Sequence, residues 1–244
     1  MKLKTSILPL FTAFLSVVGI IIRYWMHTAG TDAEGLIIKG HPSTTVMAVL
    51  LVGLGLMLAV FAFFPDRTTV RPGKSAPGAV GCYIGAVGLL ITAVTELSAM
   101  SALDNERTAS AMAGLLSVLF GFASVGVMVV MGNCRSQGKP LNRWAYTVII
   151  AFFVFHLLQQ YQVWTREPQL SSYLFPLFAS ITLMLCTYYR ASKDLVLTGQ
   201  RQYLVLSQAA LFFSMMSIGG KGWVFYCTMA AWMLLDSLPG KDVK

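Results

Sequence analysis

Apolar residues along the chain gather into eight long stretches that are separated by short polar segments. A helix needs about 20 mostly apolar residues to cross the roughly 30 Å hydrocarbon core of a bilayer. Lipid cannot satisfy the open edge of a sheet, so each stretch is expected to be helical and the fold to be all-α. The predicted spans are residues 7–26, 44–64, 79–100, 110–131, 144–164, 171–189, 203–219 and 222–237.

This alternation predicts an eight-transmembrane-helix bundle built from four hairpins, forming a single transmembrane domain over residues 1–244. Too few residues remain between the spans to form a separate soluble domain. The composition agrees, because hydrophobic residues make up 56% of the chain and charged residues only 11%, against about 25% charged residues in soluble domains. We therefore expect a polytopic integral membrane protein in contact with the lipid bilayer.

Glycines predict two features of the helix packing. Gly81, Gly85 and Gly88 lie in the third span at spacings that let a second helix backbone approach closely. The run Gly-Gly-Lys-Gly at 219–222 joins the last two spans. One continuous helix over both would be about 50 Å long, so we expect the chain to turn there. Both arms are short, and a re-entrant pair surrounded by protein or water is the alternative to two crossings.

Lysine and arginine residues gather on one side of the predicted bundle, which sets its orientation by the positive-inside rule. That side carries Lys2, Lys4, Arg67, Arg71, Lys74, Arg135, Lys139, Arg143, Arg190, Lys193, Arg201, Lys241 and Lys244. The opposite side carries Arg23, Lys39, Arg107, Arg166 and Lys221. The pattern predicts a multi-pass protein of the cell membrane with both termini in the cytoplasm. The long first apolar run, closed by Arg23, favours an uncleaved first helix over a signal peptide.

Charge and cysteine content exclude several classes of protein. The net charge of +8 is spread over separate segments, whereas nucleic-acid binding needs a clustered basic face, so no nucleic-acid partner is expected. The four cysteines include no Cys-x-x-Cys pair, which gives no support to a zinc or redox site. No nucleophile, nucleotide or metalloprotease motif is present either, and no catalytic residue and no cofactor are predicted.

Glu96 is the most informative polar residue inside a span. An ionisable side chain at the centre of a bilayer costs about 2.5–3.5 kcal/mol on insertion scales, and such residues often mark functional sites. Thr92 and Thr95 share its helix face by spacing. A carboxylate at that depth must either be protonated or meet a cation. The structural alternative is that Glu96 reaches the outer headgroup region.

His156, Gln159 and Gln160 form a second polar group, in the fifth span. Such strongly hydrogen-bonding side chains are hard to leave facing lipid. They predict either hydrogen bonds between helices, each worth about 0.6–2 kcal/mol, or a polar cavity. Both interpretations remain open from the sequence.

Arg23 closes the first span near its outer end. Its side chain can extend to the interface, pair with Glu96, or hold an anionic ligand through two parallel hydrogen bonds. Arg23, Glu96 and the His156 group lie at comparable depths on helices that run in the same direction. We therefore take Arg23, Glu96, His156, Gln159 and Gln160 as a candidate ligand-binding site that opens outward, provided that the bundle brings them together.

The loop 27–43 contains His27, Asp32, Glu34 and His41, whose spacing matches no metal-site template. We predict no metal site there. The loop could instead cover an outward-facing pocket.

Three functions are compatible with this pattern. We favour binding or transport of a small polar or anionic ligand. The alternative is a non-catalytic subunit or scaffold that assembles with a partner membrane or ATPase subunit, because the loops are too short for a coupling domain. The second alternative is an intramembrane enzyme in which Glu96 and His156 act as general acid and base. A non-catalytic role is preferred, because a nucleophile or metal would also be needed.

Overall fold

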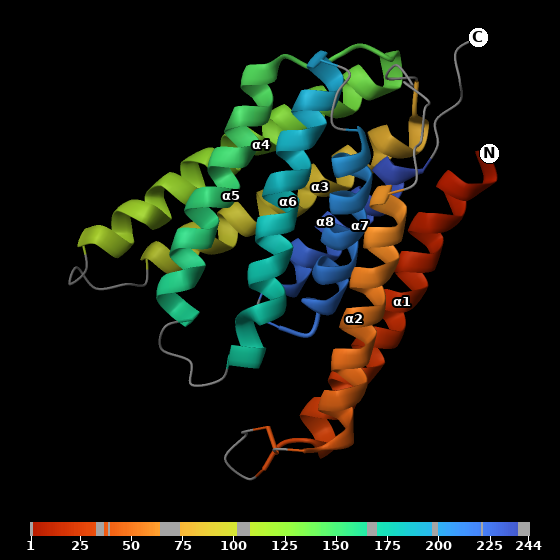
Figure 1. The fold of residues 1–244 in the computed structure, drawn as a ribbon. Coiled ribbons are helices and arrows are strands. Elements are labelled where there is room, and N and C mark those ends of the chain that lie inside the picture. The colour runs from red at the N-terminus through yellow and green to blue at the C-terminus, as the bar shows by residue number, and fades with distance from the viewer. Residues whose placement is uncertain are drawn as a thin grey trace.

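The computed structural model describes residues 2–32, 37–38, 40–63, 74–101, 108–164, 170–196, 200–220 and 222–238. The described residues form helices joined by turns and short connections, with one isolated bridge between Thr31 and Ile37 (Figure 1). The helices are α1 (Lys2–Ala29), α2 (Pro42–Phe63), α3 (Ala76–Ser101), α4 (Thr108–Gln137), α5 (Arg143–Trp164), α6 (Leu170–Val196), α7 (Gln200–Met216) and α8 (Trp223–Ser237).

Each predicted span coincides with one of these helices, so the all-helical prediction is confirmed. Helices α4 and α6 continue past the predicted ends at 131 and 189, to Gln137 and Val196, whereas α7 stops at Met216, before the predicted end at 219. The backbone turns there, with Gly220 N bonded to the carbonyl of Ser217 at 3.2 Å. Gly222 has a φ of 76°, a left-handed conformation that favours glycine.

Six of the helices in the described part, α1 to α6, are long and apolar enough to cross a membrane. Many large apolar side chains lie exposed on their outer faces, including Phe14, Val49, Leu56 and Leu119. Monomeric soluble proteins rarely expose continuous apolar patches of this kind. The outer surface of the bundle is therefore suited to lipid.

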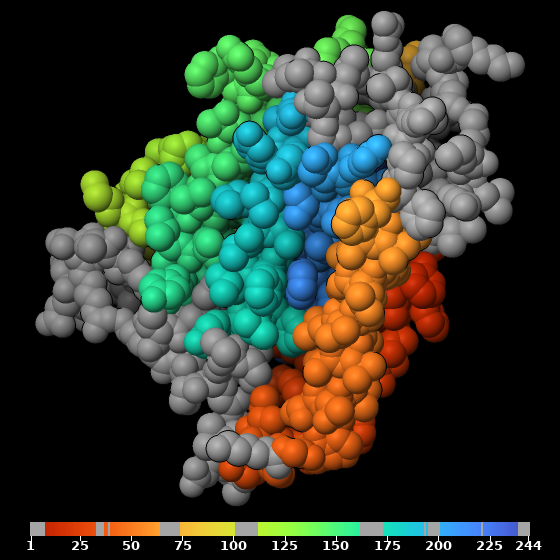
Figure 2. Space-filling view, in the orientation of Figure 1, coloured from red at the N-terminus to blue at the C-terminus, as the bar shows by residue number. Residues whose placement is uncertain are grey.

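Helices α7 and α8 lie at the centre of the bundle. α8 packs against α3 and α7, and α7 packs against α6, α1 and α2. Figure 2 shows α7 as a strip between the surfaces of α6 and α2. In α8, the side chains of Phe225, Met229, Trp232 and Met233 are almost fully buried. Protein surrounds these two helices, so their short length exposes little backbone to lipid.

A row of glycines on α3 lets α8 approach closely, which confirms the prediction for Gly81, Gly85 and Gly88. A Cβ added at Gly81 would lie 3.2 Å from the backbone oxygen of Trp232. A Cβ at Gly85 would lie 3.5 Å from the Cβ of Trp232, and one at Gly88 would lie 2.6 Å from the Cβ of Thr228. We call the contact along these three glycines the α3–α8 seam.

A buried ionic network fixes the other end of α8. The carboxylate of Asp236 accepts a hydrogen bond from Nη2 of Arg135 at 2.9 Å. It also accepts from Nη1 of Arg190 and from the hydroxyl of Tyr203. These residues belong to α4, α6, α7 and α8, so one carboxylate joins four helices. We call this group the Asp236 network.

Candidate functional site

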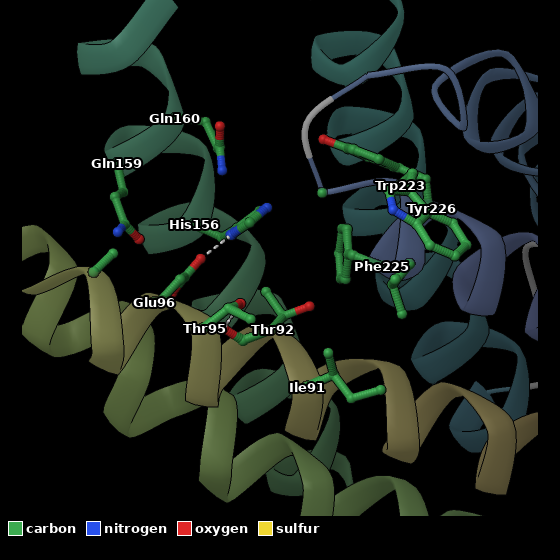
Figure 3. A pocket seen from close by; sticks show the side chains of 13 residues that line it. Ile91, Thr92, Thr95, Glu96, His156, Gln159, Gln160, Trp223, Phe225 and Tyr226 are labelled. Carbon is green, nitrogen blue, oxygen red and sulfur yellow. Dashed lines mark hydrogen bonds and ion pairs between the residues drawn. The ribbon is translucent and has the colours of Figure 1, made fainter.

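A cavity of about 390 Å³ lies at the N-terminal end of α8 (Figure 3). The Asp236 network lies at the other end of the same helix. α3 and α5 form its polar side, and α8 forms its aromatic side. The polar side carries Thr92, Thr95, Glu96, His156, Gln159 and Gln160. The aromatic side carries Trp223, Phe225 and Tyr226.

Glu96 is buried on the polar side of the cavity, with only 8% of its residue surface exposed, and its carboxylate receives several hydrogen bonds. The hydroxyl of Ser117 on α4 donates to Oε2 at 2.7 Å. Nδ1 of His156 lies 2.7 Å from Oε1. With its amide nitrogen facing Glu96, Gln159 donates to both carboxylate oxygens, at 3.3 Å to Oε1 and 3.1 Å to Oε2. Three donors from two neighbouring helices thus offset part of the cost of burying this carboxylate.

The imidazole ring of His156 is held in a single orientation. It stacks on Phe152 of its own helix at a centroid distance of 5.3 Å and packs against Phe225 of α8 at 4.9 Å. Since a carboxylate accepts hydrogen bonds, the bond to Glu96 places the proton of a neutral ring on Nδ1. Figure 3 shows the second ring nitrogen pointing away from Glu96, into the open space of the cavity. His156 therefore presents Nε2 as an acceptor when the ring is neutral.

Thr92 and Thr95 also present acceptors to the cavity. Each hydroxyl donates its one proton to the backbone of α3, from Thr92 to the carbonyl of Gly88 at 2.9 Å and from Thr95 to the carbonyl of Thr92 at 2.8 Å. A hydroxyl that has used its proton retains an acceptor lone pair. Both threonines therefore favour a ligand that donates hydrogen bonds.

The N-terminus of α8 forms part of the aromatic side. Gly222 is the N-cap residue, and no side-chain hydrogen bond caps the helix. The backbone NH groups of Phe225 and Tyr226 point to the carbonyl of Gly222, whereas those of Trp223 and Val224 precede the first intrahelical bond. Gly222, Trp223 and Val224 all line the cavity.

The structure brings together four of the five candidate residues: Glu96, His156, Gln159 and Gln160. Arg23 does not join them. Its Nη1 donates to the carbonyl of Met216 at the end of α7, and its guanidinium carbon lies 5.2 Å from the ring centroid of Phe175. Equal depth did not imply adjacency, because α1 packs mainly on α7 and α2. Of the three roles considered for Arg23, pairing with Glu96 is therefore not the one formed, and the side chain instead satisfies a carbonyl at a helix end.

Sequence reasoning missed the residues that close the site from other helices. Ser117 lies in a smooth apolar span, and Phe225 and Tyr226 resemble ordinary core residues of a short helix. No local pattern distinguishes them, because their role depends on which helices become neighbours. The Asp236 network was also missed, although an acidic residue inside the last apolar stretch was a usable signal.

The loop residues that were weighed as metal ligands are only partly described. Within the described ranges, no three His, Cys, Asp or Glu residues form a group that could hold a metal ion. His41 instead has its Nδ1 2.7 Å from the hydroxyl of Ser43. Glu34 lies outside the described residues.

Comparison of the chain with protein-family models, with curated proteins and with solved structures gives no match in any of the three.

Proposed function

We propose that this chain is an integral protein of the cell membrane with eight crossings and with both termini in the cytoplasm. The lysine and arginine distribution supports this orientation. The six long apolar helices and the exposed apolar surface support insertion in lipid. Central burial of α7 and α8 supports two short crossings, since neighbouring helices shield their ends. In this orientation the cavity opens to the outer side, and the Asp236 network lies on the cytoplasmic side.

The proposed function is binding of a small molecule in the cavity, as a recognition or transport step. One observation carries it: a buried carboxylate and histidine are bonded to each other and also border an open volume. Purely structural hydrogen bonds between helices need no adjoining space. The volume of about 390 Å³ lies within the range of about 300–1,000 Å³ that is usual for small-molecule sites.

The two alternatives have less support from the lining of the cavity. Catalysis by Glu96 and His156 would need a nucleophile or a metal as well. Among the described lining residues there is no Cys, Ser or Asp, and both threonine hydroxyls donate to the backbone. A scaffold role would use the polar side chains only as links between helices. Such links do not require an open volume beside them, so a scaffold role does not account for the cavity.

A blocking substitution tests ligand binding directly. Ala99 is exposed and lines the cavity, so Ala99→Trp should fill part of it, whereas Leu97→Trp places the same side chain at an exposed position of the same helix that does not line the cavity. A ligand at about 100 times its Kd stabilises a protein by about 2.7 kcal/mol, or about 5–10 °C in melting temperature for this size. We expect hits from a small-molecule screen to give such shifts with wild type and Leu97→Trp, but not with Ala99→Trp.

Equal shifts in all three proteins would place the ligand elsewhere and contradict this function. A screen of several thousand compounds without any cavity-dependent hit would favour the scaffold role.

Reporter fusions test the proposed topology. Alkaline phosphatase is active only outside the cytoplasm. Green fluorescent protein does not fluoresce when it is exported in unfolded form, so its fluorescence reports a cytoplasmic location. We expect a fusion after residue 220 to give phosphatase activity and a fusion to the full chain to give fluorescence. If the fusion after residue 220 fluoresces instead, α7 and α8 form a re-entrant pair and the count of eight crossings is wrong.

A further inference from the structure

The polar side of the cavity is built to receive hydrogen-bond donors. The hydroxyl groups of Thr92 and Thr95 already donate their protons to backbone carbonyls of α3. Nε2 of His156 is aimed into the cavity, and no hydrogen-bond partner for it lies among the described residues. Behind the ring, Glu96 supplies negative charge. Among the described residues that line the cavity there is no lysine or arginine.

The opposite side of the cavity has the reverse character. The N-terminus of α8 has no side-chain cap, and its first residues, Gly222, Trp223 and Val224, line the cavity. The backbone NH groups of Trp223 and Val224 precede the first intrahelical bond. The macrodipole of a helix places about half a positive charge at its N-terminus. Free NH groups together with this partial charge make a helix N-terminus a ready site for a carboxylate or phosphate. His156 gives an independent indication of a ligand. Its residue is only 3% exposed, and its Nε2 faces the same cavity without a hydrogen-bond partner among the described residues.

We infer that the cavity binds a small zwitterion of the amino-acid type. Its ammonium group donates to Nε2 of His156 and to the threonine oxygens, near the charge of Glu96. Its carboxylate accepts from the N-terminus of α8. The remaining part of the ligand packs on Phe225 and Trp223, whose ring faces also attract a cation. This inference rests on the proposed function. It departs from the simple anion that the sequence allowed as a ligand, because Arg23, the residue expected to hold an anion, lies away from the cavity.

Matched probes separate the two charges of the ligand. We would measure thermal unfolding of the full chain in mild detergent with each common amino acid, with its decarboxylated amine and with its N-acetyl derivative. The amine lacks the carboxylate, and the N-acetyl derivative lacks the positive charge. At least one amino acid should raise the melting temperature by several degrees. Each of its two derivatives should bind about tenfold more weakly or worse, since hydrogen bonds to charged groups are the stronger kind.

Two variants assign each charge to its side of the cavity. Glu96→Gln should weaken the amino acid and the amine alike and leave the N-acetyl derivative unchanged. Gly222→Asp adds a competing carboxylate at the α8 N-cap, where a Cβ has room. It should weaken the amino acid and leave the amine unchanged. Gly222→Ala is the matched control for the left-handed backbone at this position, and Gly222→Asp should weaken the amino acid clearly more than Gly222→Ala does.

Several results would overturn the inference. Hits that are all amines, all neutral compounds or all anions would reject a zwitterion, while the proposed binding function would stand if Ala99→Trp abolished them. Amino-acid binding that survives both Glu96→Gln and Gly222→Asp would place the ligand elsewhere. Lys221 lies next to Gly222 in sequence but outside the described residues. The binding measurements therefore include Lys221→Gln, which tests whether this lysine holds the carboxylate of the ligand. Loss of binding in that variant alone, with both other variants normal, would reject the assignment of the carboxylate to α8.

Discussion

Asp236→Asn is expected to lower the free energy of unfolding by about 3–5 kcal/mol, the usual cost of removing one partner of a buried ion pair. The Asp236 side chain is 0% exposed, and that of Arg190 is 2% exposed. The substitution keeps the shape of the side chain but removes the charge that Arg135 and Arg190 share. The buried guanidinium of Arg190 and the partly buried guanidinium of Arg135 then remain with a neutral amide between them. Thermal unfolding in detergent should show a fall of about 6–20 °C.

Two further variants show whether charge is the cause. Asp194 is half-buried, and its charge attracts Arg135 and Arg190, but the hydrogen bond that it accepts comes from Tyr146. Asp194→Asn leaves the carboxylate of Asp236 bonded to both arginines, so its loss of stability should be clearly smaller. Adding Arg190→Met to Asp236→Asn removes one of the two uncompensated charges and should restore part of the lost stability. A fall for Asp194→Asn as large as that for Asp236→Asn, or no recovery in the double variant, would contradict the argument.

The helices were predictable from the sequence because lipid imposes a strong, local constraint on each of them. An apolar run of about 20 residues admits one solution, and its length and flanking charges are visible in the chain. Glu96, His156 and Gln159 were predictable for the same reason, since polar groups stand out against an apolar background. Their mutual contact was not predictable, because it depends on how α3 and α5 are arranged around α8.

Arg23 and Arg190 show where that reasoning reached its limit. Both lie near the ends of helices, where a basic side chain usually extends to the interface. The sequence does not distinguish such a residue from one that turns inward to a carbonyl or a carboxylate. Arg23 turns to the carbonyl of Met216, and Arg190 turns to Asp236. In both cases the partner lies far along the chain, and only the fold brings it close.

One helix links the two polar regions of the molecule. α8 supplies Phe225 and Tyr226 to the cavity at its start and Asp236 to the ionic network at its end. Between them, its face lies against the glycines of α3. Displacement of α8 from α3 would therefore change the aromatic wall of the cavity and strain the network together. The α3–α8 seam is the place where both effects can be tested with a single methyl group.

Gly88→Ala is expected to cost about 1–3 kcal/mol in stability, the usual range for overpacking a close contact. The added Cβ would lie 2.6 Å from the Cβ of Thr228 and closer still to its hydroxyl oxygen. Thr228 has little freedom to move, because its hydroxyl donates to the carbonyls of Val224 and Phe225 at 3.0 and 2.8 Å. The two helices must separate, so the stabilisation by any cavity ligand should fall together with the melting temperature.

Gly53 provides a matched control, because it lies exposed inside α2 and a Cβ there would meet nothing within 4 Å. Gly53→Ala should be neutral or stabilising by up to about 1 kcal/mol, since alanine is the better helix former. Adding Thr228→Gly to Gly88→Ala removes the obstructing side chain and should recover part of the loss, less the helix cost of the new glycine. If Gly88→Ala behaves as Gly53→Ala does, the two helices are not in close contact at this point. The position of α8 would then not depend on the glycines of α3, and the cavity and the network would have to be treated as independent sites.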